Sequence, residues 1–91
     1  MKFIYKSSFV KAFDKLNAKD QELIIATDKL IKTYFETQKA SFGLRIKKLH
    51  EGVFEARVND KLRTVWIMGK DEVVFSLLGN HEDVRRFVKN L

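Results

Sequence analysis

Residues 53–78 contain three short stretches rich in apolar and β-branched residues, and three turn-forming residues separate each stretch from the next. The stretches span residues 53–58, 62–68 and 72–78. The separators are Asn59-Asp60-Lys61 and Gly69-Lys70-Asp71. Connections this short join antiparallel strands, because a parallel pair needs a crossover of about a dozen residues or more. The sequence therefore predicts a three-stranded antiparallel meander, on which the rest of the chain must pack.

Two amphipathic helices are predicted before this meander. The first begins after a serine N-cap at Ser7 or Ser8 and ends near Asn17. The second begins after Asn17, and its apolar stripe consists of Leu23, Ile24, Leu30, Ile31, Tyr34 and Phe35. Helices joined by so short a turn form an antiparallel helical hairpin. Both apolar stripes are expected to pack against the sheet.

The remaining segments complete an α+β domain. Residues 2–5 are predicted to form a strand, residues 36–43 a loop, residues 44–49 an irregular strand before a turn at 50–52, and residues 82–89 a short helix. The run at 72–78 is almost entirely apolar, which is typical of a central strand. We therefore expect one domain, residues 1–91, with the helical hairpin on one face of a mostly antiparallel sheet and the other face partly open.

The composition narrows the classes of function. The formal net charge of +6 suits a polyanion or an acidic protein partner. The absence of cysteine excludes disulfides and zinc–thiolate sites, and two histidines thirty-one residues apart give no metal-ligand spacing. We expect no metal and no cofactor. No apolar run approaches the roughly 20 residues of a membrane span, and no signal peptide is recognised, so we expect a cytoplasmic protein.

Two arginines flank the Asn59-Asp60-Lys61 turn. With a three-residue loop, Arg57 and Arg63 pair directly and share a face with Glu55, which lies across from Val65. Like charges in direct opposition are destabilising unless an anion relieves them, and arginine suits phosphate. A two-residue loop instead pairs Arg57 with Leu62 and places Arg63 on the opposite face. The sequence leaves both registers open, and on residue type alone the favoured interpretation is two solvated arginines, one of them paired with Glu55 or Asp60.

His81 follows Gly79-Asn80 at the end of the last predicted strand. Loops at strand ends often carry functional side chains, and histidine suits proton transfer near neutral pH. The alternative interpretation is a turn histidine, or one that caps the last helix. His50, in another turn, has no evident partner and is interpreted as a surface residue.

The order and spacing of these pieces resemble the RelE/ParE superfamily of bacterial toxins from type II toxin–antitoxin systems. The resemblance spans nearly the whole chain, through FVKAFDKL, IKKL, FEARVNDKLRTVW and LGNHEDV. It implies a compact α+β fold with a curved antiparallel sheet, and a cognate acidic antitoxin as partner. In the RelE-like branch it implies metal-independent cleavage of mRNA on the ribosome, in which a 2′-hydroxyl attacks the adjacent phosphate.

The resemblance also implies roles for individual residues. Arg63 matches a strand arginine of that branch, and Arg57 matches a basic position on the preceding strand. His81 falls where some members have arginine and others a histidine used in proton transfer. Glu55 stands where RelE has lysine, although related toxins use a carboxylate in the site, so Glu55 or His81 is the candidate general base. Phe87 stands near the position of a C-terminal tyrosine of RelE.

A basic segment completes the set of candidate residues, and three of its side chains are predicted RNA-backbone contacts: Arg45, Lys47 and Lys48. Two other functions are compatible with the sequence. One is a ParE-like inhibitor of DNA gyrase, which keeps the fold and the charge but does not need His81. The other is a catalytically weak or inactive interaction module.

Overall fold

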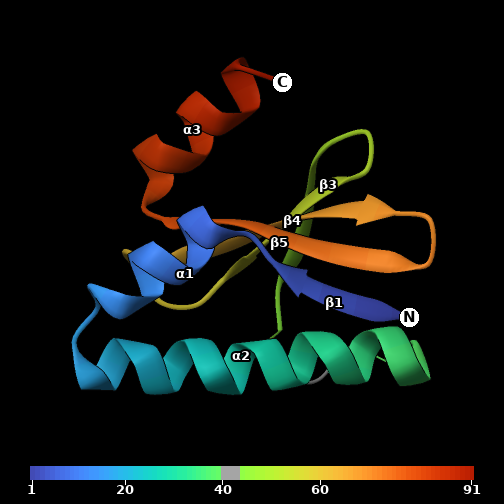
Figure 1. The fold of residues 1–91 in the computed structure, drawn as a ribbon, viewed down its shortest axis with the longest axis horizontal. Helices are drawn as coiled ribbons and strands as arrows, with labels where there is room; N and C mark the ends of the chain where they lie inside the picture. The colour runs from blue at the N-terminus through green and yellow to red at the C-terminus, as the bar shows by residue number, and fades with distance from the viewer. Residues whose placement is uncertain (40–43) are drawn as a thin grey trace.

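A computed structural model describes residues 1–39 and 44–91 of the chain. The elements follow one another as β1 (Lys2–Tyr5), α1 (Ser7–Asp14), α2 (Ala18–Thr37), β2 (Ile46–His50), β3 (Val53–Arg57), β4 (Arg63–Gly69), β5 (Glu72–Gly79) and α3 (His81–Lys89). The five strands form one sheet in the order β1-β5-β4-β3-β2 (Figure 1). The α+β fold expected from the sequence is confirmed, including the helical hairpin and the short last helix.

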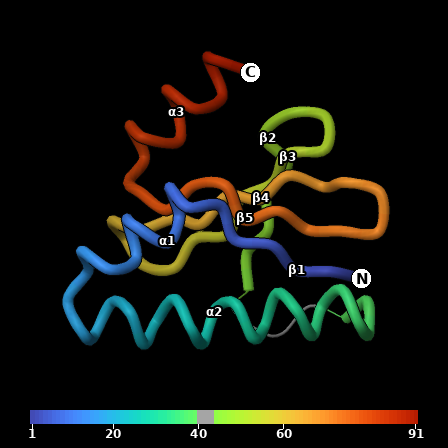
Figure 2. The backbone as a smooth tube through the Cα atoms, in the orientation of Figure 1, coloured from blue at the N-terminus to red at the C-terminus, as the bar shows by residue number. Residues whose placement is uncertain are grey.

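The predicted meander forms the body of this sheet. Strands β2 to β5 pair antiparallel with their neighbours in sequence, and Figure 2 traces the hairpins β2–β3 and β4–β5 beside one another. β1 pairs with β5 in parallel, with Phe3 opposite Val73 and Tyr5 opposite Phe75. This parallel pairing makes β5 a strand with neighbours on both edges, which explains its apolar sequence.

One face of the sheet is covered by α1 and α2, which lie on the same side of it (Figure 1). Trp66 is fully buried on this face, with its ring stacked on Phe54 at 6.1 Å and edge-on to Phe35 at 6.2 Å. The buried cluster here comprises Phe9, Ile24, Ile31, Ala56, Leu62, Trp66, Val73, Phe75 and Leu78. It draws on both helices and on β3, β4 and β5, so it is the main core of the domain.

The opposite face carries α3 and a smaller core. Val53, Val65 and Val84 are buried together there, and Phe87 and Val88 pack partly buried against them. The predicted helical spacing in the last segment is thus confirmed. Because α3 is short, it covers only part of this face (Figure 1).

The ends of several elements differ from the sequence prediction. The N-cap of α1 is Lys6 without a side-chain hydrogen bond, because the hydroxyl of Ser8 instead donates to the carbonyl of Ser76 at 3.3 Å. α1 also ends earlier than expected, at Asp14. His50 belongs to β2 rather than to a turn, since a bulge between Lys48 and His50 extends that strand.

The second helix is longer than predicted. It continues through Thr37, inside the expected 36–43 loop, and its C-cap residue, Gln38, adopts a left-handed conformation with φ of 60°. The hydroxyls of Thr33 and Thr37 donate to the carbonyls four residues earlier, so both side chains find their acceptors within the helix. The last part of that loop, residues 40–43, lies outside the described residues. Among the described helices, none has the length and apolar character needed to cross a membrane.

Candidate functional site

The turn at Asn59-Asp60-Lys61 sets the register that the sequence left open. The amide of Val58 donates to the carbonyl of Leu62 at 2.9 Å, and the side-chain oxygen of Asn59 accepts from the amides of Lys61 and Leu62. Arg57 therefore pairs with Arg63, as the three-residue alternative predicts. Asn59 is the cause, because an Asx turn that caps two amides fixes the loop at this length.

Glu55 forms an ion pair with one of the two arginines, Arg63. Its Oε1 lies 3.8 Å from Nε of Arg63, and the two side chains are only 13% and 10% exposed, respectively. Arg57 is exposed on the same face. A buried guanidinium beside a buried carboxylate relieves the repulsion between paired arginines. Arg63 is thus held by the protein and is not free on an open surface.

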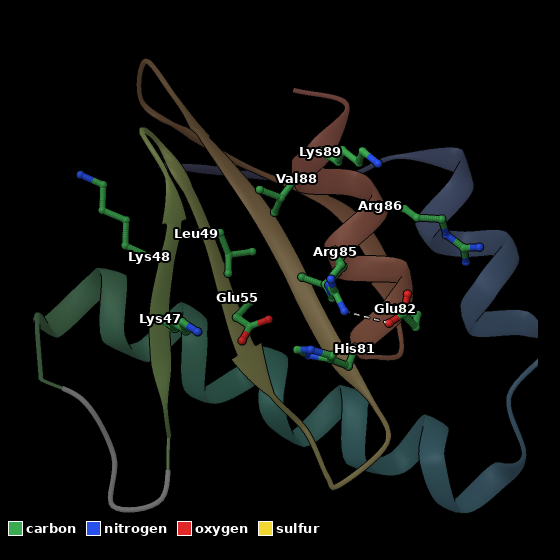
Figure 3. A pocket seen from close by; sticks show the side chains of 11 residues that line it. Lys47, Lys48, Leu49, Glu55, His81, Glu82, Arg85, Arg86, Val88 and Lys89 are labelled. Carbon is green, nitrogen blue, oxygen red and sulfur yellow. Dashed lines mark hydrogen bonds and ion pairs between the residues drawn. The ribbon is translucent and has the colours of Figure 1, made fainter.

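A groove of about 560 Å³ lies between α3 and strands β2 and β3 (Figure 3). Its apolar floor consists of Leu49, Val84 and Val88. The polar side chains that line it are Lys47, Lys48, Glu55, His81, Glu82, Arg85, Arg86 and Lys89. This volume is in the range of small-molecule sites, which is about 300–1,000 Å³. The groove combines an apolar floor with cationic walls, which suits a nucleotide.

Charged groups of opposite walls face each other across this groove. In Figure 3, Lys47 and Glu55 extend from β2 and β3 toward α3, His81 extends from α3 toward the strands, and Arg85 is turned toward Glu82 on its own helix. Arg85 also donates to Glu82 at 3.2 Å. The arrangement brings one carboxylate and one imidazole, separated by twenty-six positions in sequence, into a single basic cavity.

The position of His81 depends on the N-terminal cap of α3. Asn80 and Asp83 form a capping box, in which each side chain accepts from the other's backbone amide at 2.9 Å. The hydrogen bond from the Asn80 amide, with the nearby Arg86 guanidinium, holds the pKa of Asp83 below its usual range. A Cβ on Gly79 would lie 2.5 Å from Oδ2 of Asp83, so only glycine fits there. His81 is therefore the first helical residue, and Asn80, not His81, is the cap.

Replacing Asn80 by alanine should lower the free energy of unfolding by about 0.5–2 kcal/mol, because the amide of Asp83 loses its acceptor. Urea unfolding followed by circular dichroism measures this. The contribution of Asp83 itself is present above its usual pKa of 3.8 and is lost as the pH falls through the lower, folded value. Asn90→Ala, at the other end of α3, is the matched control and should change stability by less than about 0.5 kcal/mol. Equal effects of both variants would contradict the capping role.

The groove contains only some of the residues that the sequence singled out. Glu55, His81 and Lys47 line it and point into it. Lys48 is at its edge, but its ammonium group is bound to Glu51 at 3.0 Å and points away (Figure 3). Arg45, predicted as an RNA contact, and Arg57, predicted as a catalytic residue, are exposed and do not line the groove.

Sequence reasoning missed the cationic face of α3. Arg85 and Lys89 follow His81 at intervals of four residues, which places all three on one side of the helix. That spacing was available in the sequence and would have identified them. Phe87, in contrast, packs partly buried against the small core and does not line the groove. Within residues 1–39 and 44–91, no group of three or more histidine or acidic residues is arranged to hold a metal ion.

Comparison with known proteins gives structural relatives without sequence relatives. No family model and no curated protein sequence matches the chain. A chain of the RelB–RelE antitoxin–toxin complex from Methanococcus jannaschii superimposes with a TM-score of 0.68 at 15% identity, covering 92% of this chain and 96% of the other.

Two further structures agree. A chain of the DinJ–YafQ complex from E. coli has a TM-score of 0.65 at 15% identity, covering 91% and 96% of the two chains. The YoeB/ParE toxin from Agrobacterium tumefaciens has a TM-score of 0.64 at 19% identity, covering 89% and 99%. Matches this complete include the sheet, the helical hairpin and the last helix, so the chain has the fold of the RelE, YafQ and YoeB toxins, as the resemblance in its sequence implied.

Proposed function

We propose that this protein is the toxin of a type II toxin–antitoxin system and acts as a metal-independent, ribosome-dependent mRNA endoribonuclease. One observation carries the proposal: Glu55 and His81 line opposite walls of one basic groove on the sheet. A base and an acid on either side of a phosphate are what the attack of a 2′-hydroxyl requires. The shared fold with RelE, YafQ and YoeB supports the same assignment.

In this mechanism Glu55 accepts the proton of the 2′-hydroxyl. The 2′-oxygen then forms a bond to the adjacent phosphorus while the bond from phosphorus to the 5′-oxygen breaks. His81, in its protonated form, donates a proton to that departing 5′-oxygen. The products are a 2′,3′-cyclic phosphate and a 5′-hydroxyl, and no metal or cofactor takes part.

The cationic residues have two different roles. Lys47 and Arg85 face the groove and stabilise the additional negative charge on the phosphate in the transition state. Arg63 is buried beside Glu55 and orients its carboxylate, so it is a positioning residue. The apolar floor formed by Leu49, Val84 and Val88 receives a base or a ribose. This division follows from the lining of the groove, which includes Lys47, Glu55 and Arg85 but not Arg63.

The net charge of +6 also suits the partner that a toxin of this kind requires, an acidic antitoxin. The structures of RelB–RelE and DinJ–YafQ are complexes of a toxin fold with its antitoxin. A neighbouring reading frame that encodes a short acidic protein should therefore relieve growth arrest when both are expressed.

Primer extension on a message translated in a purified system tests the proposal. The wild-type protein should produce discrete cleavages in the translated message, and none where the 2′-hydroxyl at the cleaved position is replaced by hydrogen. The His81→Ala variant should cleave at least about 10²-fold more slowly, and His50→Ala, outside the groove, is the matched control. Absence of cleavage together with inhibition of gyrase supercoiling would replace this proposal by the ParE-like alternative.

A further inference from the structure

The two walls of the groove differ in their access to water. Glu55 and His81 lie on opposite walls (Figure 3). The side chain of Glu55 is only 13% exposed and lies beside Arg63, whereas His81 is exposed in the first turn of α3. The helix neighbours of His81 are also exposed, with 66% of the Glu82 side chain and 67% of the Arg85 side chain accessible. Solvent therefore reaches the groove mainly from the His81 wall.

This difference between the walls has a consequence once an RNA has been cleaved. In the proposed mechanism, cleavage leaves the proton of the 2′-hydroxyl on Glu55 and leaves His81 without its own proton. The fragment with the 5′-hydroxyl departs from the His81 side, which is the wall open to solvent. The fragment with the cyclic phosphate is held by its base or ribose on the apolar floor of Leu49, Val84 and Val88. A water molecule can then take the place of the departed 5′-hydroxyl.

Glu55 and His81 are then in the protonation states that the reverse proton transfers need. By microscopic reversibility, groups that act as base and acid in one direction of a reaction act as acid and base in the other. Water differs from the 5′-hydroxyl only in carrying a hydrogen in place of the ribose carbon, so it uses the same position and the same two side chains. A second reaction therefore requires no further catalytic group.

We propose that the groove also hydrolyses the 2′,3′-cyclic phosphate that it forms, an inference that rests on the proposed function. His81 accepts a proton from water, and the water oxygen forms a bond to phosphorus while the bond from phosphorus to the 2′-oxygen breaks. Glu55 donates its proton to that departing 2′-oxygen. The product is a 3′-phosphate, and both side chains return to the states in which cleavage began. One water molecule is consumed, and no other reactant takes part.

The role of Glu55 also decides which bond of the cyclic phosphate breaks. Glu55 takes its proton from the 2′-hydroxyl during cleavage, so the proton returns to the 2′-oxygen and not to the 3′-oxygen. Opening in the groove should therefore give 3′-phosphate alone, whereas uncatalysed opening of a cyclic phosphate gives both 2′- and 3′-phosphates. The proportion of these two ends distinguishes hydrolysis in the groove from hydrolysis in solution.

The 3′ ends of the upstream RNA fragments test this inference. The wild-type protein cleaves a message in a purified translation system made up in ¹⁸O-labelled water, and mass spectrometry follows the ends over time. Cyclic ends should appear first and convert to 3′-phosphates that carry one ¹⁸O atom. The conversion should be at least about 10²-fold faster than in the same fragments freed of protein. His50→Ala, outside the groove, should behave as the wild type does.

A short synthetic message with sulfur in place of the 5′-oxygen at the cleaved bond separates the two steps. Its leaving group needs no proton, so His81→Ala should cleave it but leave the cyclic ends unopened, because the water still lacks a base. Cyclic ends that persist with the wild-type protein, or that open to a mixture of 2′- and 3′-phosphates, would overturn the inference and leave the proposed function standing. Ring opening by His81→Ala at the wild-type rate would also overturn it. Absence of any cleavage would instead remove the proposed function, and this inference with it.

Discussion

Replacing Glu55 by glutamine should lower the rate of RNA cleavage by about 10²–10⁴-fold, the contribution typical of a positioned general base. Glutamine keeps the size of the side chain and its place in the groove, but it cannot accept the proton of the 2′-hydroxyl. The loss should appear in single-turnover rates at saturating protein, since the apolar floor and the cationic walls that bind the RNA remain. A change confined to RNA affinity would contradict the role as base.

A modified substrate separates the base from the acid. When sulfur replaces the 5′-oxygen at the cleaved bond, the leaving group no longer needs a proton. The His81→Ala variant should therefore recover most of its lost rate on this substrate, and Glu55→Gln should recover none. The opposite pattern would exchange the two roles, and recovery by neither variant would place the proton transfers elsewhere in the groove.

The Glu55→Gln substitution should also change the stability of the protein, which must be measured beside the cleavage rate. Arg63 is 8% exposed and loses a charged partner, so we expect Glu55→Gln to reduce the free energy of unfolding by about 1–3 kcal/mol. Circular dichroism must show that the variant is folded under the assay conditions. Glu51→Gln is the matched control, because Glu51 is an exposed carboxylate paired with Lys48 outside the groove. It should change neither cleavage nor stability measurably.

The sequence predicted the parts of the fold that local chemistry determines. Turn residues and alternation predicted the meander, whereas the register of the Arg57–Arg63 pairing stayed open until the structure showed the Asx turn at Asn59. Alternation also placed Glu55 on the same face as both arginines. The parallel pairing of β1 with β5 was not predicted, because it joins residues about seventy positions apart and no local pattern encodes such a contact.

The candidate site shows which properties of a residue its sequence pattern cannot predict. Alternation tells which face a side chain occupies but not how deeply it is buried there. Arg63 and Arg57 share a face, yet only Arg63 is buried, because its neighbours include Glu55 and the small core beneath α3. The groove itself exists only because α3 folds back over the sheet. The cationic residues of α3 line the groove only because of that tertiary contact.

The second large effect is expected at Trp66, the largest fully buried side chain of the domain. Trp66→Ala should reduce the free energy of unfolding by about 3–5 kcal/mol, as is typical when a large aromatic side chain is removed from a core. Three aromatic rings surround the indole and lose their packing: Phe35, Phe54 and Phe75. In a chain of 91 residues this is a large part of the total stability.

Trp66→Phe should cost less than half as much. It retains a ring in the same place, and it removes an indole Nε1 that is buried without a hydrogen-bond partner among residues 1–39 and 44–91. Urea unfolding is followed by far-ultraviolet circular dichroism, because replacing Trp66, the one tryptophan of the sequence, removes the fluorescence signal. Ile25→Ala, on the exposed side of α2, should change the free energy of unfolding by less than about 0.5 kcal/mol.

Because Trp66 faces the helical hairpin and the groove lies on the other face, Trp66→Phe should cleave RNA at the wild-type rate. A slower rate in the folded variant would mean that the main core and the groove are coupled through the sheet.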